Sequence, residues 1–535
     1  MPETVFDLQF PDGATERCYS PSTVVFEHLD AGTALAVAEL RPRLRLALGA
    51  AAERVKDKYG YYCSAASDQL AALEARLDAF GPHSVVRVLA VHPKVSAPPF
   101  DEVVAQEQTR VAAARSRIPL EGSYPVVIVG GGQAGLAMSW HLTRAGLRHL
   151  VLEKHAIGHA WRNERWNNFC LVTPNWQCRL PGFPYRGDDP DGFMPKDAIV
   201  EYVEGFAASF EPPIQEGVTV ERITPEDGGG YTIVARRGKE VCEIEADQVV
   251  VAAGAYGAPR IPEYAGGISE DILQLHSSTY RKSASLPEGA VLVVGSGQSG
   301  CQIAEDLHFD GRKVLLSVGN APRSPRHYRG RDVVAWLEET GHYDAPIADE
   351  PDPEATRRKT NHYVTGRDGG REIDLRAHAR DGMRLLGRLD AIDASGRATF
   401  HDDLVERLDA ADATYVRIRE MIDRHIVECG LDLPAEPPYQ PCWLPDEVPT
   451  ALDLQDAGVS VIVWAIGFHQ SFDSVHADVF DSGGYPRHLR GVTDAPGLYF
   501  LGLPWLHSWG SGRFSHVDRD ARHLFEAILQ RASAA

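Results

Sequence analysis

Two uninterrupted runs of apolar residues, at 126–129 and at 291–294, are the strongest strand signals in the chain. Strands that are buried on both faces of a parallel sheet show such runs, whereas half-exposed strands alternate apolar and polar residues. Each run is followed directly by glycines and then by a helical spacing of apolar residues. The pattern predicts two strand–helix–strand units, whose first glycines, Gly130 and Gly295, are 165 residues apart.

A different pattern precedes these units. Thr4 to Phe10 alternates apolar and polar residues, which predicts a strand, and a second short strand is expected near Cys18. Residues 31–59 and 65–80 have the apolar spacing of helices. We therefore expect a small α+β module over residues 1–85 and a connector over 86–121, with a short charged helix at 101–117.

The glycines after the two strands have the spacing of dinucleotide-binding loops. In a G-x-G-x-x-G loop, the first glycine makes a tight turn, the second lets the backbone approach a pyrophosphate, and the third lets the helix pack on the strand. The helix N-terminus then faces the phosphate charge. The candidate cofactor-binding residues are Gly130, Gly132, Gln133, Ala134 and Gly135 in the first loop and Gly295, Gly297, Gln298, Ser299 and Gly300 in the second. Two such loops indicate redox chemistry between two dinucleotides.

The two units differ at the end of their second strand, where dinucleotides are discriminated. The first ends in Glu153, followed by Lys154, and a carboxylate there accepts hydrogen bonds from the ribose hydroxyls of FAD or NAD. The second ends in Ser317 with no acid, and Arg323 and Arg326 follow. Guanidinium groups bind a 2′-phosphate, which a carboxylate would repel. The sequence therefore predicts FAD at the first site and NADPH at the second.

These assignments divide the rest of the chain. We expect an α/β fold with two Rossmann-like dinucleotide-binding domains, the NADPH-binding domain being inserted into the FAD-binding domain. The FAD-binding domain is expected to cover residues 122–265 and 451–535, and the NADPH-binding domain residues 266–330. A mostly helical insertion is expected at 331–450, and strand character returns at 459–465.

Composition and charge narrow the classes of partner. The chain has 535 residues and a net charge of −21, which disfavours binding to nucleic acid or to an anionic membrane surface. No apolar run approaches the roughly 20 residues that a membrane-spanning helix needs, and the start does not read as a signal peptide. The eight cysteines form neither C-x-x-C nor a zinc-like cluster. We therefore expect no metal site and a cytoplasmic location.

Four further motifs stand outside the glycine loops: Gly158-His159-Ala160-Trp161-Arg162, Ala252-Ala253-Gly254, His276-Ser277-Ser278-Thr279-Tyr280-Arg281 and Trp464-Ala465-Ile466-Gly467-Phe468. Together they resemble motifs of the flavin-containing monooxygenases, which use FAD and NADPH in one polypeptide. The resemblance implies that five of these residues contribute to cofactor binding: Trp161, Arg162, Ala253, Gly254 and Gly467.

Two more segments, 170–178 and 497–512, resemble a bacterial subfamily of flavoproteins found in nitrogen-starvation and nitrilase gene clusters. The N-terminal module resembles the small nitrogen-starvation response protein of the same clusters. The subfamily resemblance implies that Gly502 and Leu503 lie against the flavin ring. It also implies that a helix starting near Ser515 directs its positive end at the ring. The N-terminal module is expected to be a protein-binding or regulatory unit.

The resemblance implies a monooxygenase in nitrogen or nitrile metabolism. NADPH would pass a hydride to FAD, and a peroxyflavin would then transfer oxygen from molecular oxygen to a small nitrogen- or sulfur-containing substrate. Thr173, Asn175, His276 and Tyr280 are the catalytic candidates. The chain departs from the family in three respects. Asn175 is displaced from the expected active-site position, and only His276 and Tyr280 remain of a longer signature. Gly319-Asn320 replace the arginine that often follows the second ribose strand. An FAD-dependent NADPH oxidase or dehydrogenase without oxygen transfer is the alternative.

Overall fold

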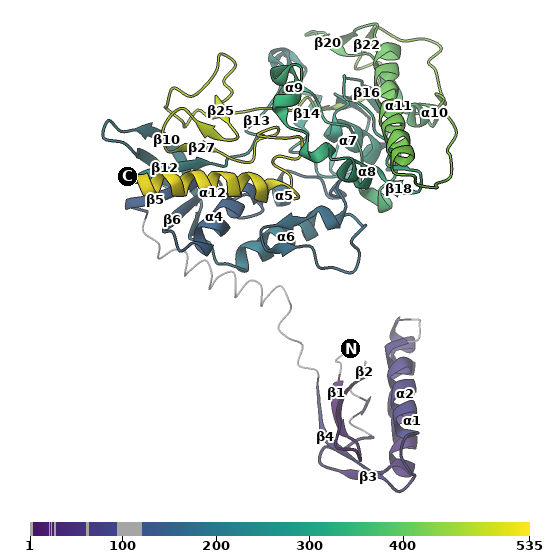
Figure 1. Cartoon of the computed structure of the whole chain (residues 1–535). Helices are drawn as coiled ribbons and strands as arrows, with labels where there is room; N and C mark the ends of the chain where they lie inside the picture. The colour runs from purple at the N-terminus through teal and green to yellow at the C-terminus, as the bar shows by residue number, and fades with distance from the viewer. Residues whose placement is uncertain are drawn as a thin grey trace. The chain divides into compact units, whose positions relative to one another are not determined.

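The computed structural model describes residues 4–20, 22, 24–25, 28–59, 64–93 and 120–534 (Figure 1). The chain divides into two compact units, Met1–Ala114 and Arg115–Ala535. Each unit has a hydrophobic core of its own, so each is described by itself.

The first unit is a four-stranded antiparallel sheet with two helices. The strand order is β2 (Thr15–Ser20), β1 (Thr4–Gln9), β4 (Val85–Pro93) and β3 (Ala34–Ala36), and helix α1 (Val37–Tyr59) packs against α2 (Ser64–Leu77). Phe6 and Leu8 on one face of β1 are buried in a core that includes Leu44 and Leu73 of the helices. The two strands and two helices expected in this region are confirmed.

This sheet extends beyond the predicted module boundary at residue 85. β4 begins there and pairs with both β1 and β3, so it lies inside the sheet and not in a connector. Val86 and Val88 are buried while Val85 and Leu89 are exposed, which is the alternation of a half-buried strand. The charged helix expected at 101–117 lies outside the described residues.

The larger sheet of the second unit contains the first predicted strand–helix–strand unit (Figure 1). Its order is β25 (His488–Leu489), β26 (Val492–Thr493), β27 (Leu498–Phe500), β12 (Glu240–Val251), β5 (Gly122–Val129), β6 (His149–Glu153) and β9 (Ile214–Glu216). The strands from β27 to β9 are parallel, and β10 (Val218–Pro225) and β11 (Tyr231–Arg237) extend β12 as an antiparallel ribbon. Helix α4 (Gln133–Arg144) packs against α12 (Val517–Ala534), and α5 (His159–Asn163) packs against α6 (Lys196–Ala208).

The second sheet contains the second predicted unit and is parallel throughout. Its order is β14 (Leu273–His276), β23 (Val459–Trp464), β15 (Ala290–Val294), β16 (Val314–Ser317) and β19 (Arg384–Leu386), and α7 (Gln298–Phe309) joins β15 to β16. The strand expected at 459–465 is confirmed. It pairs with β14 and β15, however, so the return to the FAD-binding domain comes after it and not at residue 451.

The segment 331–450 is less helical than predicted. It contains α8 (Val333–Glu339), α9 (Pro353–Arg358), α10 (Leu375–Arg380) and α11 (Leu404–Glu428). It also supplies β19 to the second sheet, and β20 (Leu389–Ile392) and β21 (Arg397–Phe400) to a small sheet with β22 (Ala451–Asp453). The remaining strands of the described residues form three short pairs. These are β7 (Arg179–Leu180) with β8 (Phe183–Pro184), β13 (Ala258–Pro259) with β24 (Phe468–His469), and β17 (His327–Tyr328) with β18 (Arg331–Asp332).

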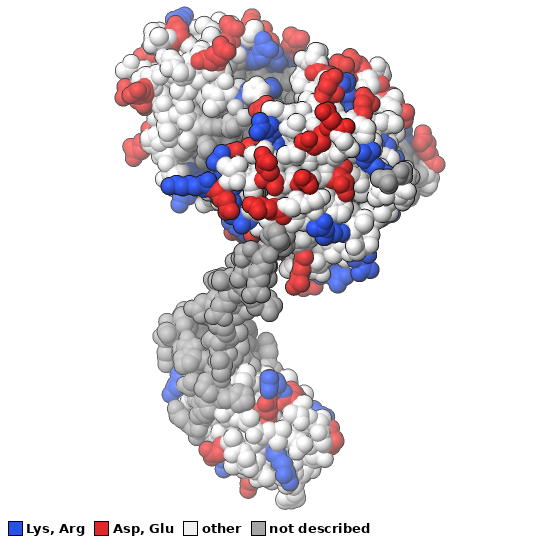
Figure 2. All heavy atoms as spheres, turned by 90° about the vertical axis from the view of Figure 1, so that its left-hand side faces the viewer, with Lys and Arg blue, Asp and Glu red and all other residues white. Residues whose placement is uncertain are grey.

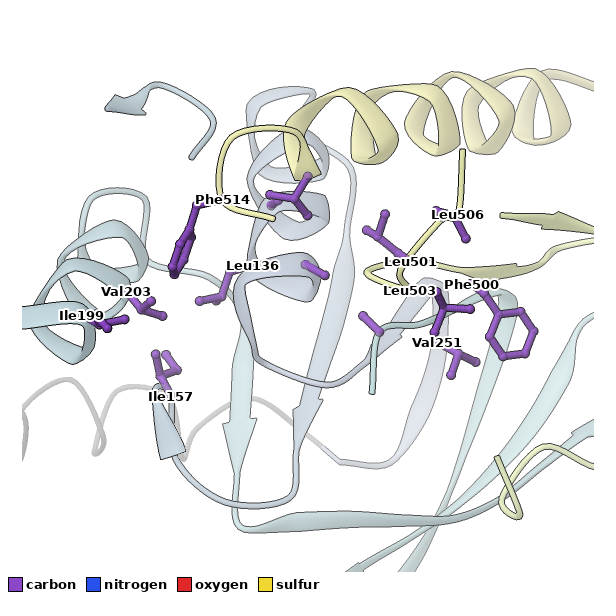
Figure 3. Close-up of a cluster of buried hydrophobic side chains, with 14 of the residues drawn as sticks. Leu136, Ile157, Ile199, Val203, Val251, Phe500, Leu501, Leu503, Leu506 and Phe514 are labelled. Atoms are coloured by element: carbon purple, nitrogen blue, oxygen red, sulfur yellow. The ribbon is translucent and has the colours of Figure 1, made fainter. Parts of the chain in front are cut away.

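The two sheets of the second unit share one continuous apolar core. Val127 of the larger sheet and Val293 of the second sheet are both fully buried in it. Figure 3 shows the part of this core around α4, where Phe514 points toward Ile199 and Val203 of α6. The core therefore holds the chain after β27 in place beside α4.

The charge of the visible surface agrees with the amino-acid composition. Acidic side chains are more abundant than basic ones on the face of the second unit shown in Figure 2, in keeping with the net charge of −21. Over the described residues, no helix combines the length and the apolar character that crossing a membrane requires.

Candidate functional site

The first glycine loop joins β5 to α4 and leaves no room for side chains at two positions. Gly130 has φ +109°, which L side chains rarely adopt, and a Cβ there would overlap the carbonyl oxygen of Ala252. A Cβ at Gly135 would overlap the carbonyl oxygen of Gly130. A Cβ at Gly132, in contrast, would meet nothing within 4 Å, and Gly132 precedes α4 without a side-chain cap. The loop is therefore open where the first amides of α4 would meet a phosphate.

The second glycine loop repeats this geometry between β15 and α7. Gly295 has φ +101°, and a Cβ there would lie 2.6 Å from the carbonyl oxygen of Ala465. A Cβ at Gly300 would overlap the carbonyl oxygen of Gly295. Gly297 precedes α7 without a side-chain cap, and a Cβ there would lie 3.7 Å from Cγ2 of Thr360. The remaining predicted loop residues, Gln133, Ala134, Gln298 and Ser299, form the first turns of α4 and α7.

Glu153 ends β6 beside the first loop, where the sequence analysis places it. Its carboxylate accepts a hydrogen bond from the amide of Gly131 at 2.6 Å and another from the amide of His155 at 2.8 Å. The side chain is half-buried, and the neighbouring Lys154 is exposed. A carboxylate held beside an open glycine loop fits the ribose of FAD.

Ser317 ends β16, but its hydroxyl is already engaged. The side chain is buried, donates a hydrogen bond to the carbonyl of Gly387 at 3.1 Å and accepts one from the amide of Leu389 at 2.9 Å. These bonds join β16 to the chain that follows β19. The geometry gives Ser317 a structural role in place of the predicted contact with the nucleotide.

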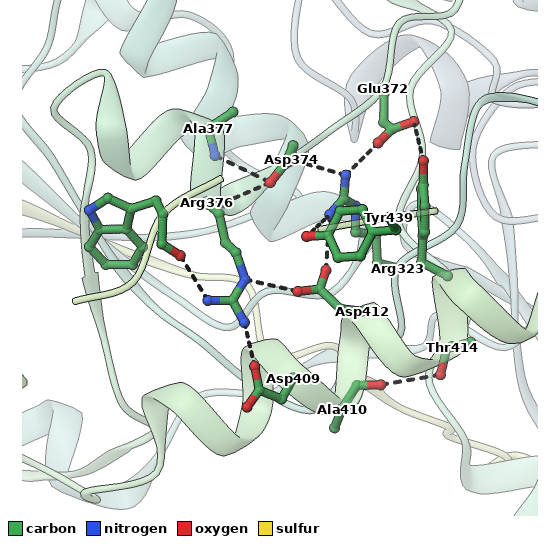
Figure 4. Close-up of polar contacts among 12 residues, drawn as sticks. Arg323, Glu372, Asp374, Arg376, Ala377, Asp409, Ala410, Asp412, Thr414 and Tyr439 are labelled. Carbon is green, nitrogen blue, oxygen red and sulfur yellow. Dashed lines mark hydrogen bonds and ion pairs between the residues drawn. The ribbon is translucent and has the colours of Figure 1, made fainter. Parts of the chain in front are cut away.

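The prediction that Arg323 binds a 2′-phosphate is wrong. Its side chain is 2% exposed and forms ion pairs with Glu372, with Asp374 at 2.9 Å and with Asp412 at 2.9 Å (Figure 4). The carboxylates lie 49 to 89 residues further along the chain, so no local pattern announces them. Burial alone would lower the pKa of this guanidinium, but the surrounding acids raise it above its usual value.

The same prediction for Arg326 is also wrong. This side chain is 1% exposed, forms an ion pair with Asp332 and donates to the carbonyl of Val172 at 2.8 Å. Its guanidinium also stacks over the ring of Phe193, at 4.3 Å from the ring centroid. Because the charge is neutralised inside the protein, Arg326 supports the fold and is not available to a phosphate.

The C-terminal segment lies against the first glycine loop, as the subfamily resemblance implies. A Cβ at Gly502 would lie 2.6 Å from the Cβ of Ala134, so the segment approaches α4 as closely as backbone permits. The side-chain amide of Gln133 donates to the carbonyl of Gly512 at 3.0 Å. Leu503 is buried in the core. Two parts of the chain that are distant in sequence therefore meet at the start of α4.

Trp161, a residue of α5, packs against the same C-terminal segment. Its ring stacks on Phe514 of the C-terminal segment, with centroids 5.8 Å apart. Arg162 turns away, forming an ion pair with Glu204 of α6. Trp161 therefore packs against the C-terminal segment, whereas Arg162 anchors α6.

Ala253 and Gly254 directly follow β12 at the edge where the first loop lies. The amide of Ala252 donates to the carbonyl of Val129, so the two strands remain paired up to the loop. Gly254 then has φ +80° and leads the chain toward the second sheet.

His276 and Tyr280, two predicted catalytic residues, form structural hydrogen bonds. His276 is 3% exposed, and its ring nitrogens lie 2.9 Å from the hydroxyl of Ser278 and 3.0 Å from the carbonyl of Gly467. Burial lowers the pKa of this imidazole, while the bond to Gly467 raises it. Tyr280 is fully buried, and its hydroxyl donates to Asp306 at 2.7 Å. Both residues therefore join the chain after β14 to other parts of the second sheet's domain, His276 to Gly467 after β23 and Tyr280 to Asp306 of α7.

Asn175 is also engaged in the fold. Its side chain is buried, donates to the carbonyl of Asp189 at 2.9 Å and accepts from the amide of Met194 at 2.9 Å. Thr173 is half-buried in the same segment. Asn175 borders a cavity of about 490 Å³ lined chiefly by Phe183, Tyr185, Phe193, Met194 and Tyr202.

One stretch without a sequence motif connects the two loops. The amide of Ile347 donates to the carbonyl of His507 at 2.8 Å, and the amide of Gly510 donates to the carbonyl of Tyr343 at 2.9 Å. Further along, Thr360 adjoins Gly297 of the second loop. Residues 343–360 thus run from the C-terminal segment to the second glycine loop, a connection that no sequence motif indicates.

Comparison with known proteins agrees with this architecture. Residues 127–341 match the family model described as pyridine nucleotide-disulphide oxidoreductase, and residues 5–91 match that of the nitrogen starvation-induced protein NitG. An uncharacterized oxidoreductase from Geobacillus kaustophilus, described as CzcO-like, is 31% identical over 407 residues, which cover 76% of this chain and 98% of the relative. The chain belongs to the CzcO-like oxidoreductases.

Several other similar proteins are monooxygenases. Indole-3-pyruvate monooxygenase YUCCA1 from Oryza sativa is 33% identical over 195 residues, covering 36% of this chain and 47% of that relative. A solved flavin-containing monooxygenase from Stenotrophomonas maltophilia superposes with a TM-score of 0.53 at 20% identity, covering 77% of this chain and all of that one. The CzcO-like unit therefore has the fold of flavin monooxygenases, and the predicted α/β fold class and family are confirmed.

Proposed function

We propose that this protein is an NADPH-dependent monooxygenase that binds FAD at the first glycine loop and NADPH at the second. The pair of loops within one unit carries the proposal, since each opens on a helix N-terminus without a side-chain cap. The similarity to YUCCA1 supports oxygen transfer. The substrate we propose is a small nitrogen- or sulfur-containing compound, and the reacting partner is molecular oxygen.

The protein's own residues would bind and enclose the cofactors. Glu153 would hold the FAD ribose, and the first amides of α4 would hold the pyrophosphate. Trp161 and Phe514 form an apolar wall beside that loop, which would keep water away. FAD, when bound, supplies the hydride acceptor and the centre for oxygen chemistry. His276 and Tyr280 would stabilise the domain of the second sheet and would not touch the reacting atoms.

Lys359 takes the place of Arg323 and Arg326 as the candidate cation for the NADPH phosphates. It precedes Thr360, the residue beside Gly297, and its side chain is 67% exposed. No acid ends β16, so nothing at that position repels a 2′-phosphate. We expect NADPH to be preferred over NADH, and Lys359→Ala to raise KM for NADPH several-fold with little change in kcat.

Reaction stoichiometry tests the proposal and separates it from an oxidase. The purified protein is supplied with NADPH, and the hydrogen peroxide released is measured with and without candidate amines and thioethers. A monooxygenase releases less peroxide per NADPH when a substrate is present, and ¹⁸O from labelled oxygen gas enters the product. Release of one peroxide per NADPH with every compound would instead establish the oxidase alternative.

We propose that the N-terminal unit recruits a protein partner or regulates the enzyme. It would not take part in turnover. It forms a compact unit of its own. The Geobacillus relative, matched over 98% of its length, aligns over 407 residues, slightly fewer than the second unit contains. Deletion of residues 1–95 is expected to leave turnover unchanged and to remove binding of a protein partner. Loss of turnover would mean that the unit covers the substrate site.

A further inference from the structure

Arg513 differs in its ionic contacts from the buried arginines around the second sheet. Arg323, Arg326 and Arg376 each form an ion pair with at least one carboxylate. Among the residues that the structure describes, Arg513 forms no such pair. Its guanidinium stacks instead over the ring of Trp509, at 4.0 Å from the centroid, and its Nε donates to the Trp509 carbonyl at 3.2 Å. The side chain is thus fixed in place while its charge is left unneutralised.

The neighbours of Arg513 along the chain place it at the first glycine loop. Gly512 accepts the hydrogen bond from Gln133 at the start of α4. Phe514, on its other side, stacks on Trp161 (Figure 3 shows Phe514 beside α4). Arg513 therefore stands between Gly512, which contacts Gln133 of the loop where FAD is proposed to bind, and Phe514, which stacks on Trp161.

The surroundings of Arg513 extend toward the second loop. Trp509 contacts His342, with ring centroids 4.7 Å apart, and the charge of Arg513 acts on both His342 and His362. His362 comes two residues after Thr360, which adjoins Gly297. The guanidinium thus faces the stretch of chain between the two dinucleotide loops.

The titratable groups around Arg513 leave its charge unneutralised. Lys359 lies in the same stretch of chain, but it pairs with Glu350 at 3.8 Å. Burial and the charge of Arg513 lower the pKa of His342. Burial, His342, Arg513 and Arg417 together lower the pKa of His362 to about 4. Glu350 faces His342, but its carboxylate accepts from the hydroxyl of Thr356 at 3.0 Å. Arg417, which faces His362, is exposed on α11.

We propose that Arg513 binds the carboxylate of a small monoanionic substrate with an apolar body. The planar guanidinium fork matches a carboxylate in two parallel hydrogen bonds, and stacking on Trp509 presents it in a fixed orientation. Trp509, His342 and Tyr343 supply ring surface for the apolar part. One charge selects monocarboxylates over neutral analogues. The inference rests on the proposed function for placing the substrate beside the flavin.

Equilibrium binding to the oxidised holoenzyme tests this without turnover. The full chain is titrated with benzoate and with benzamide, which differ only in the charge of the head group, while flavin absorbance and tryptophan fluorescence are recorded. Benzoate should bind at least ten-fold more tightly than benzamide. Arg513→Met should remove that preference, and Arg513→Lys should retain part of it. Arg522→Met, an exposed arginine of α12 paired with Asp518, is the matched control and should behave as the wild type.

Three results would overturn the proposal. These are a failure of benzoate to bind the wild-type protein, equal binding of both probes, and an Arg513→Met variant that keeps the preference. A shift of the flavin midpoint potential in Arg513→Met, with the benzoate preference unchanged, would show that Arg513 faces the flavin instead. Because neither NADPH nor oxygen enters the titration, an absence of monooxygenase activity would be a separate finding. Flavin content and the Arg513→Lys variant distinguish lost binding from lost folding.

Discussion

The two glycine loops share one backbone geometry but end in different side-chain arrangements. In both, the first glycine has a positive φ and lies against a carbonyl from a neighbouring strand, and the third packs on the carbonyl of the first. The strand that follows ends in Glu153 in one case, with its carboxylate beside the loop, and in Ser317 in the other, with its hydroxyl bonded into the sheet. The phosphate-binding part is therefore repeated, whereas the nucleotide-discriminating part is built separately in each domain.

The largest effects should come from adding a methyl group to the third glycine of either loop. Gly135→Ala should abolish FAD retention, because its Cβ would overlap the carbonyl of Gly130. Gly300→Ala should keep FAD but lose reduction by NADPH, since the equivalent overlap is with Gly295. Flavin absorbance per protein and the rate of anaerobic flavin reduction measure the two effects. Gly266→Ala, where a Cβ meets nothing within 4 Å, is the control.

If the two variants instead had the same phenotype, the loops would not serve separate cofactors. Loss of flavin from Gly300→Ala, with normal retention in Gly135→Ala, would reverse the assignment of the two sites. Thermal unfolding of each variant shows whether the domain itself has collapsed.

The glycine loops were predictable because their requirement is local and steric. A fixed spacing after a buried strand suffices to place Gly130 and Gly135, and the structure puts them at the expected turn. Arg323 shows the opposite case. Its position after β16 suggested a phosphate ligand, but Glu372 and Asp412, remote in sequence, neutralise it. Sequence spacing locates a residue, whereas tertiary packing decides whether its polar atoms are available.

Membership of a sheet was likewise decided by long-range pairing. The strand Val459–Trp464 was recognisable from its apolar run. Its place between β14 and β15, however, depends on partners that lie 169 to 188 residues earlier in the chain. The contact between Thr360 and Gly297 has no sequence signal at all, because Thr360 lies in an irregular segment.

The next largest effect is expected at Arg323, the buried cation that follows β16. Arg323→Met should lower the free energy of unfolding by about 3 to 5 kcal/mol, because three carboxylates would lose their shared cation. Urea unfolding followed by circular dichroism measures this loss. In the fraction that remains folded, KM for NADPH should equal that of the wild type. A raised KM with unchanged stability would restore Arg323 as a nucleotide ligand.

A smaller effect is expected at Glu153, the acidic end of the strand that follows the first glycine loop. Glu153→Gln keeps the shape of the side chain but removes the charge that strengthens its hydrogen bonds to Gly131, to His155 and to the ribose. FAD affinity should fall by about ten-fold, or about 1.4 kcal/mol. Titration of the apoprotein with FAD measures it. An unchanged affinity would mean that Glu153 only organises the loop.

The smallest effect should come from Ser317→Ala, and it is the sharpest test of the difference between the two strand ends. The change removes the acceptor for the amide of Leu389 and the donor to the carbonyl of Gly387, both inside the protein. We expect a loss of about 1 kcal/mol in the free energy of unfolding. The ratio of kcat/KM for NADPH to that for NADH should stay the same, because the hydroxyl faces the sheet and not the ligand. A several-fold change in that ratio at unchanged stability would show that Ser317 contacts the nucleotide, and the two strand ends would then discriminate dinucleotides in the same way.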